Sequence, residues 1–417
     1  VNVKAKMLSS VRGRLLVRPL ALSFTSNSTE MFQQVWSPQV VAPLARIRGR
    51  VSSVVSELVQ LRPESVAWGH AVEAVNSIAL SAQATFLRPQ LVLLGHAAAR
   101  GSISNLQGVD DAVEGFAAGV ELQHLFMLVH DDVMDRGTLR RGMATTHRAL
   151  QSLGVEIDVA GNAVTVVGDV VHARAMALVV ESALAVAHRE TDPATIQSAH
   201  DAINVTMDSA YRAGVAQFED ILGWRAARTR LNSPESVDKF ISQFTYDKGA
   251  HHTFVAPLVA GLKLGGGHEQ LEAISKTWGT HAGLAFQGLD DLMDLVSDPL
   301  NLGKDTFQDV NEGRLSLPLI LLHRACEEAE WEQVLAMRGG FFGDMAARRT
   351  WHNLVSKYEL FDRTLVWIEG EIAAAEKDVT ELRDDDSAAS STLAEGLSAF
   401  TQGLRQHAKA VAEQTKQ

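Results

Sequence analysis

The sequence predicts an all-α fold, a large single-domain helical bundle around a central cavity. Three observations support this prediction. Apolar residues recur at helical spacing from about Met31 onward, and alternating patterns at hairpin spacing do not recur. Several of the helical segments exceed the average helix length, and long helices pack side by side in bundles. Two helix-patterned segments carry closely spaced aspartates, which indicates charged groups facing a cavity.

The first thirty residues differ in composition from the rest of the chain. Residues 1–30 hold five basic side chains and several serines, and no acidic residue precedes Glu30. This composition is typical of a transit peptide, but it also fits an extended beginning ahead of a start at Met7 or Met31. We favour the second interpretation. We therefore expect residues 1–30 to be a poorly ordered basic tail and residues 31–417 to form one all-α domain.

The expected helices begin and end at residues with recognisable conformational preferences. Pro63, Pro193 and Pro234 each neighbour an acidic residue, as is common in the first turn of a helix, and the glycines at 265–267 end a helix. The long segments expected to be helical are 109–135, 158–188, 194–223 and 235–263, with a final amphipathic helix at 391–415.

Composition excludes several classes of protein. The net charge of −12 argues against nucleic-acid binding. Cys326 is the only cysteine, so no disulfide framework is possible and a reducing compartment, the cytoplasm, is expected. No apolar run approaches 18 residues, so we expect no membrane span.

The first aspartate motif lies in VHDDVMDRGTLRRG, residues 129–142. Asp131 and Asp135 are four residues apart and therefore share a helix face, with Asp132 beside them. Such carboxylates in an apolar segment repel one another unless a cation joins them, and hard oxygen ligands favour Mg²⁺. Arg140 and Arg141 follow, and guanidinium groups pair well with phosphate. The pattern predicts a magnesium-dependent polyphosphate site.

A second aspartate motif makes this interpretation more specific. FQGLDDLMD, residues 286–294, repeats the spacing with Asp290, Asp291 and Asp294. Either motif alone occurs often on solvated helix faces. Two motifs in apolar helical segments predict facing acidic helices that hold magnesium between them.

These motifs resemble those of a known family. HDDVMDRGTLRRG, FQGLDDLMD and the later GKDTFQDVNEGRLSLPLI (303–320) are similar to the aspartate-rich regions of trans-isoprenyl diphosphate synthases, the polyprenyl synthetase family. The similarity covers roughly residues 85–320 and implies an isoprenoid-synthase-like bundle. In that family, magnesium bridges both motifs to an allylic diphosphate, whose carbon is then attacked by isopentenyl diphosphate.

The resemblance implies roles for further residues, position by position. Arg88, His124 and Arg141 match residues that bind the diphosphate of isopentenyl diphosphate. Arg140 and Lys248 match groups that contact the allylic diphosphate. Gln287 matches a polar residue near the second motif, and Lys304 matches a lysine that closes over the leaving group. Phe126 matches a bulky residue that limits product length, and Met127, four residues before Asp131, lies on the same helix face and obstructs a growing tail.

The chain also departs from the family pattern. Aligned on Leu87-Arg88-Pro89, the family has lysine at the position of Thr85 and arginine at that of Phe86. Gly249 replaces a threonine after Lys248, and Arg314 replaces a lysine. The first departure removes a cation expected to hold isopentenyl diphosphate.

The leading hypothesis is head-to-tail condensation of isopentenyl diphosphate with an allylic diphosphate, giving a farnesyl or geranylgeranyl all-trans product. The expected partners are these two substrates, Mg²⁺ and a second copy of the chain. The alternatives are a class I terpene cyclase or unusual prenyl coupling enzyme on the same fold, and a non-catalytic regulatory subunit. A silent subunit has no need for six mutually repelling carboxylates, which speaks against the last.

Overall fold

The structure, a computed structural model, describes residues 38–102, 109–224, 234–296 and 307–414. The regular elements of the first two ranges are, in chain order, α2 (Pro38–Glu57), the 3-10 helix η1 (Leu58–Leu61), α3 (Val66–Leu80), α4 (Leu87–Ala99), α5 (Asp111–Met134), β1 (Leu139–Arg140), β2 (Met143–Ala144), α6 (Thr146–Ser152), α7 (Ile157–Ala187) and α8 (Pro193–Leu222). The expected basic tail, residues 1–30, lies outside the described residues.

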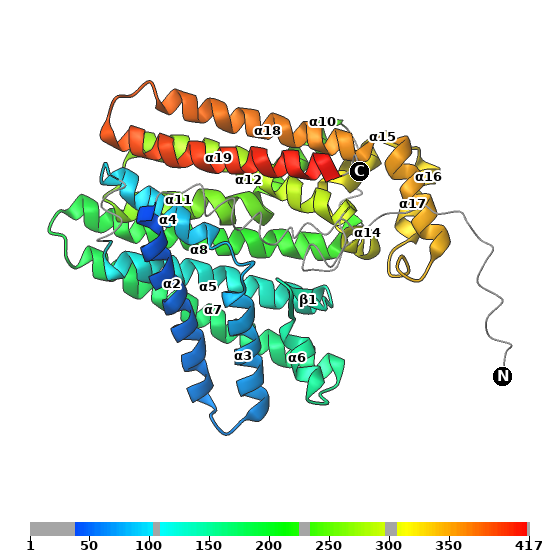
Figure 1. Cartoon of the computed structure of the whole chain (residues 1–417), viewed down its shortest axis with the longest axis horizontal. Coiled ribbons are helices and arrows are strands. Elements are labelled where there is room, and N and C mark those ends of the chain that lie inside the picture. Colours follow the sequence, from blue (N-terminus) through cyan, green and yellow to red (C-terminus); the bar gives the residue numbers. More distant parts are fainter. Residues whose placement is uncertain (1–37, 103–108, 225–233, 297–306, 415–417) are drawn as a thin grey trace, which may run out of the picture.

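The later ranges complete the bundle. Their elements are α10 (Pro234–Thr245), the π-helix η3 (Tyr246–Val255), α11 (Ala256–Leu264), α12 (Glu269–Val296), α14 (Gln308–Glu312), α15 (Leu317–Ala325), α16 (Glu328–Ala336), α17 (Met345–Lys357), α18 (Leu360–Leu382) and α19 (Ala388–Gln414). In Figure 1, α18 and α19 pack as a hairpin against α12, whereas α2 and α3 project away from the bundle on its opposite side.

The all-α prediction is confirmed, and so are most of the expected helices. The segments 109–135, 158–188 and 194–223 correspond to α5, α7 and α8, and the final helix begins three residues earlier than expected, at Ala388. Strands are as rare as predicted, since β1 and β2 form the only sheet among the described residues.

The segment expected to be one helix over 235–263 is instead divided by the π-helix η3. Pro257 explains the change of winding, because it lacks an N–H group and its ring clashes with the carbonyl four residues earlier. Just before it, the N–H of Ala256 donates to the carbonyl of His251, five residues back. Wider winding of this kind often marks a functional site.

A tight hairpin follows α5. β1 and β2 pair antiparallel, with Arg140 opposite Met143, and the two residues between them have positive φ angles of 53° at Arg141 and 74° at Gly142. Two left-handed residues in a two-residue loop are typical of a type I′ turn, whose twist suits a β-hairpin. The turn brings Arg140 back beside Asp131 and Asp132 at the end of α5.

Helices α4 and α11 cross at glycines. A Cβ atom added at Gly95 would lie 2.2 Å from the carbonyl oxygen of Leu258, and one at Gly261 would lie 2.1 Å from that of Val92. Any larger residue would push the backbones apart. This close contact holds the start of α4, which carries Arg88, against the end of η3.

Two helices, α5 and α7, are long and apolar enough to cross a membrane by length and composition alone. Within the most apolar 18-residue window of each helix, 78% of the window is buried in α5 but only 39% in α7. The expected absence of a membrane span stays a prediction, and the outward face of α7 needs its own explanation.

Candidate active site

A cavity of about 700 Å³ lies between α5, α8, η3 and α12. All but one of the residues singled out from the sequence line it: Arg88, His124, Phe126, Met127, Asp131, Asp132, Asp135, Arg140, Arg141, Lys248, Gln287, Asp290, Asp291 and Asp294. The exception, Lys304, lies outside the described residues. Residues more than 200 positions apart in the chain therefore meet around one space.

The first aspartate motif forms one wall. Arg140 donates from Nε to Asp132 at 2.7 Å and from Nη2 to Asp131 at 3.1 Å. Asp131 also accepts a hydrogen bond of 3.0 Å from the amide of Gln217 on α8. Asp132 is 2% exposed, and burial raises its pKa to about 6 despite the neighbouring arginine.

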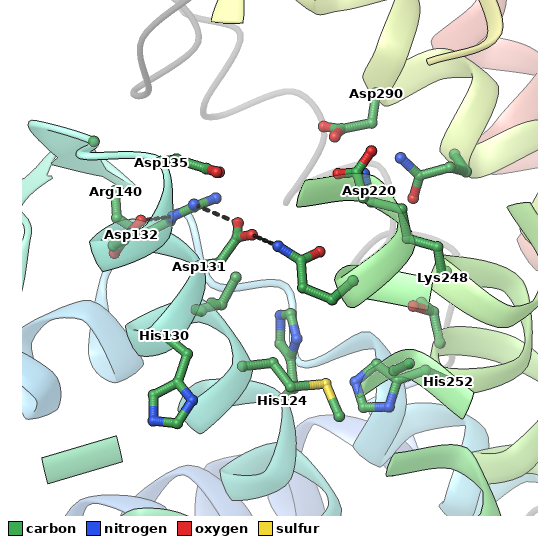
Figure 2. A pocket seen from close by; sticks show the side chains of 18 of the residues that line it. His124, His130, Asp131, Asp132, Asp135, Arg140, Asp220, Lys248, His252 and Asp290 are labelled. Carbon is green, nitrogen blue, oxygen red and sulfur yellow. Dashed lines mark hydrogen bonds and ion pairs between the residues drawn. The ribbon is translucent and has the colours of Figure 1, made fainter. Parts of the chain in front are cut away.

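The second aspartate motif forms the facing wall, and Asp290 points into the space between the two (Figure 2). Asp291 accepts from the amide of Gln287 at 2.8 Å and from the N–H of Leu317 at 2.9 Å. Burial raises the pKa of Asp291, and Lys248 opposes that rise. Asp294 accepts from the backbone N–H groups that begin α14, so it also anchors the following segment.

A buried network that sequence reasoning missed joins the two walls. Asp220 on α8 is 3% exposed and accepts from Lys248 at 2.7 Å, from the N–H of Leu315 at 3.0 Å and from Arg314 at 3.4 Å. Burial acts to lower the pKa of Lys248, but Asp220 and nearby aspartates outweigh it and raise that pKa. Arg314 also pairs with Asp135 at the end of α5.

A signal for these missed residues was present in the sequence. Gly214, Gln217 and Asp220 are spaced by three, so they lie on one side of the helix, the side that lines the cavity. Without the fold, that spacing does not show whether the face meets a cavity or solvent.

The other end of the cavity is basic. Arg88 is 9% exposed and donates to the hydroxyl of Thr253 at 2.7 Å, and burial lowers its pKa to about 10. The rings of His124 and His252 lie 5.8 Å apart, and burial lowers the pKa of both well below 6.5. Both imidazoles are therefore neutral near pH 7 and each can donate one hydrogen bond.

Gly249 lies against the side chain of Gln287. A Cβ atom at this position would lie 2.6 Å from the amide oxygen of Gln287. The side chain of Gln287 occupies that space while it donates to Asp291. A larger residue at 249 would therefore require the amide group of Gln287 to move.

The donor set fits magnesium when substrate phosphates complete the coordination. Among the described residues, no three His, Cys, Asp or Glu side chains gather closely enough to hold an ion by themselves. The carboxylates of the two motifs line one cavity, however, and the buried Oδ2 of Asp132 has no hydrogen-bond partner within the described chain. Mg²⁺ is commonly held by one or two carboxylates together with phosphate and water, and not by an all-protein cage.

Comparisons with known proteins agree with this geometry. Residues 70–343 match the family model described as polyprenyl synthetase. A geranylgeranyl diphosphate synthase of Sulfolobus acidocaldarius is 29% identical over 58% of this chain, and a short chain isoprenyl diphosphate synthase of Methanothermobacter thermautotrophicus is 30% identical over 61%. The aligned parts span 66% and 67% of these two relatives, about two thirds of their length.

Solved structures share the fold. A geranylgeranyl pyrophosphate synthase of Corynebacterium glutamicum, complexed with isoprenyl diphosphate and magnesium, superposes with a TM-score of 0.68 at 21% identity and covers 86% of this chain and 98% of its own. A polyprenyl synthase of Caulobacter crescentus, complexed with calcium and isoprenyl diphosphate, gives 0.63 at 22% identity, covering 90% and 98%. The family model spans more than half of the chain and confirms the resemblance seen in its motifs, so this protein belongs to the polyprenyl synthetase family.

Proposed function

We propose that the protein joins isopentenyl diphosphate to an allylic diphosphate and releases a short all-trans prenyl diphosphate. The observation that carries the proposal is the division of one cavity into an acidic region and a basic region. The two aspartate motifs, with Arg140 and Lys248, suit a metal-bound allylic diphosphate. Arg88, His124 and Arg141 suit a second diphosphate. The names of the relatives, several of them prenyl diphosphate synthases, support the same reaction class.

In the proposed reaction, the carbon–oxygen bond of the allylic substrate breaks and diphosphate leaves with the electron pair. Mg²⁺, when bound, would withdraw charge from that leaving group. Arg140 and Lys248 orient the leaving oxygens, and Arg88 with Arg141 holds the acceptor so that its double bond faces the allylic carbon. A new carbon–carbon bond forms, and the acceptor loses a proton to the released diphosphate.

We expect activity to require Mg²⁺ and both aspartate motifs. Asp131→Ala and Asp290→Ala should each lower kcat by a factor of at least ~10², because a lost ligand removes charge stabilisation needed as the bond breaks. Steady-state turnover at saturating Mg²⁺ is the measurement. Asp362→Ala, an exposed position in the first turn of α18, is the matched control and should keep normal turnover. Near-normal turnover in either motif variant contradicts the two-motif mechanism.

We propose a farnesyl or geranylgeranyl product, because Phe126 and Met127 narrow the cavity below Asp131. Both line the cavity, and the ring of Phe126 packs 4.2 Å from that of His172 on α7. One isoprene unit is about as long as one helical turn, ~5.4 Å, so a side chain four or five residues before Asp131 meets a tail of few units.

Replacing Phe126 and Met127 together with alanine should therefore lengthen the product. Mass spectrometry of the prenyl diphosphates reports the distribution, with either single variant giving an intermediate result. If the double variant makes the same products as the wild type, another part of the cavity limits chain length.

A class I terpene cyclase on the same scaffold is the second candidate, and the loss of cations at Thr85 and Phe86 favours it. Ionising an allylic diphosphate needs the aspartate motifs but no second diphosphate. Under this alternative, hydrocarbon or alcohol forms from the allylic substrate alone.

Thr85→Lys separates the two candidates. Thr85 lines the cavity, and a charge-assisted hydrogen bond to phosphate contributes ~1.5–3 kcal/mol, roughly ten- to hundredfold in affinity. For a synthase, the variant should lower the KM for isopentenyl diphosphate by up to that factor and leave the KM for the allylic substrate nearly unchanged. Product formation that ignores isopentenyl diphosphate in both wild type and variant would overturn the synthase proposal in favour of the cyclase.

We also propose that the protein is a homodimer, formed through α7 and α8. Four large apolar side chains form one exposed stripe along α8 at spacings of four, three and four: Tyr211 (70% exposed), Val215 (48%), Phe218 (63%) and Leu222 (43%). On the neighbouring α7, Val159 and Val166 are 54% and 58% exposed. A continuous apolar surface of this kind is typical of an interface, and a two-fold dimer covers the same face on both copies.

The double substitution Tyr211→Asp with Phe218→Asp should convert the dimer to a monomer, because it buries two charges without partners at the interface. Light scattering should then give about 45.2 kDa instead of twice that mass. Val366→Asp on α18, an equally exposed apolar position (68%), is the control and should leave the mass unchanged. A wild-type monomer contradicts the proposal.

A further inference from the structure

Arg48 on α2 lies against the segment where the family's two cations are missing. Its guanidinium group stacks over the ring of Phe86, 4.2 Å from the centroid, and donates to the carbonyl of Ala84 at 2.9 Å. Thr85, the residue between Ala84 and Phe86, lines the cavity. The guanidinium group of Arg48 therefore contacts both chain neighbours of Thr85, the position where the family has lysine.

The contact also supports a costly backbone conformation. Phe86 has φ 51° and ψ 38°, the left-handed region that bulky residues rarely adopt, and its ring is 2% exposed. A guanidinium group over an aromatic face is attractive, more so when water is excluded. Arg48 thus helps to hold the turn at the start of α4. That turn directs Arg88 into the cavity.

Arg48 belongs to a buried cluster of charges. Glu121 on α5 is 4% exposed, and burial raises its pKa while Arg141, Arg88 and Arg48 oppose that rise. Its Oε1 lies 3.9 Å from Nη2 of Arg141. Three arginines against one glutamate leave a net charge of +2. Arg88 and Arg141 line the cavity, so this excess charge faces the region where a second diphosphate is expected.

Arg48 differs in this respect from its neighbours on α2. Arg46 pairs with Glu114 and Arg50 pairs with Asp111, both on α5. Within the described part of the chain, no carboxylate lies within ion-pair distance of Arg48, and its hydrogen bond is to a neutral carbonyl. Glu121 opposes this charge from beyond ion-pair distance, whereas Arg46 and Arg50 each have a direct ion pair.

We propose that Arg48 is a positioning residue that supplies, from α2, positive charge missing at residues 85 and 86, so that Arg88 and Arg141 can hold the diphosphate of the acceptor. The inference rests on the proposed function, because that function is what requires a second diphosphate. Arg48 precedes residues 70–343, which match the family model, so the motif pattern alone does not reveal it.

Kinetics of Arg48→Ala provide the first test. The KM for isopentenyl diphosphate should rise about tenfold, because one nearby charge is lost, while the KM for the allylic substrate stays nearly unchanged. Arg48→Lys should recover part of the loss. Arg50→Ala, which removes the same charge two residues away, is the control and should match the wild type. An equal rise in both KM values, or a lower unfolding temperature with an unchanged acceptor KM, overturns the proposal.

The charge of Arg48 and the charge introduced by Thr85→Lys should also substitute for each other. In a Thr85→Lys background, Arg48→Ala should raise the acceptor KM by a smaller factor than it does in the wild type. Equal factors in the two backgrounds mean that Arg48 does not act at this position, and they contradict the proposal.

A binding measurement separates this inference from the proposed function. Calorimetry with inorganic diphosphate, without Mg²⁺, reports on the arginine cluster whether or not prenyl coupling occurs. The Kd should rise about tenfold in Arg48→Ala and stay unchanged in Arg50→Ala. If the protein makes no product that depends on isopentenyl diphosphate, yet this rise is observed, the proposed function fails and the role of Arg48 in binding diphosphate stands. Equal affinity in wild type and Arg48→Ala, or no binding by the wild type, rejects the role of Arg48.

Discussion

The pairing of buried charges is the interaction on which the site depends. Asp220 lies inside the bundle with three hydrogen-bond donors, contributed by Lys248, Arg314 and the backbone of Leu315. A buried carboxylate that lost these partners would cost several kcal/mol. The network therefore fixes α8, η3 and the segment after α14 relative to one another. It also holds Lys248 and Arg314, two of the cations that line the cavity, at defined positions.

Two local backbone features, a π-helix and a tight hairpin, direct further side chains toward the cavity. The π-helix before Pro257 turns Lys248 toward Asp220 and His252 toward His124. The type I′ hairpin returns Arg140 to the aspartates that end α5. In a straight α-helix and an open loop, these groups would point elsewhere. Both features direct polar side chains into the cavity.

The sequence was sufficient for the fold class, most of the long helices and the residues that line the cavity, because helical periodicity and motif spacing are local properties. It was insufficient wherever a contact joins distant segments. Gln217, Asp220 and Arg48 meet their partners 86, 28 and 36 residues away, and no local pattern encodes such distances. The π-helix was missed for a related reason, since Pro257 was compatible with a helix end, a kink or a change of winding.

Under the proposed function, the departure at Thr85 and Phe86 illustrates how a motif can change while a neighbouring helix supplies a similar charge. Attraction between a guanidinium group and a diphosphate falls off gradually with distance, unlike a hydrogen bond, which needs a defined geometry. A charge lost from one segment can therefore be replaced in part by a charge from any helix that packs behind it. A directed hydrogen bond cannot be replaced in this way. An anion site that relies on the charge of Arg48 should therefore attract its ligand but bind it less tightly. Under the proposed function, the chain combines two complete aspartate motifs with an acceptor region that lacks two of the family's cations, and the balance between these regions decides whether a second diphosphate binds.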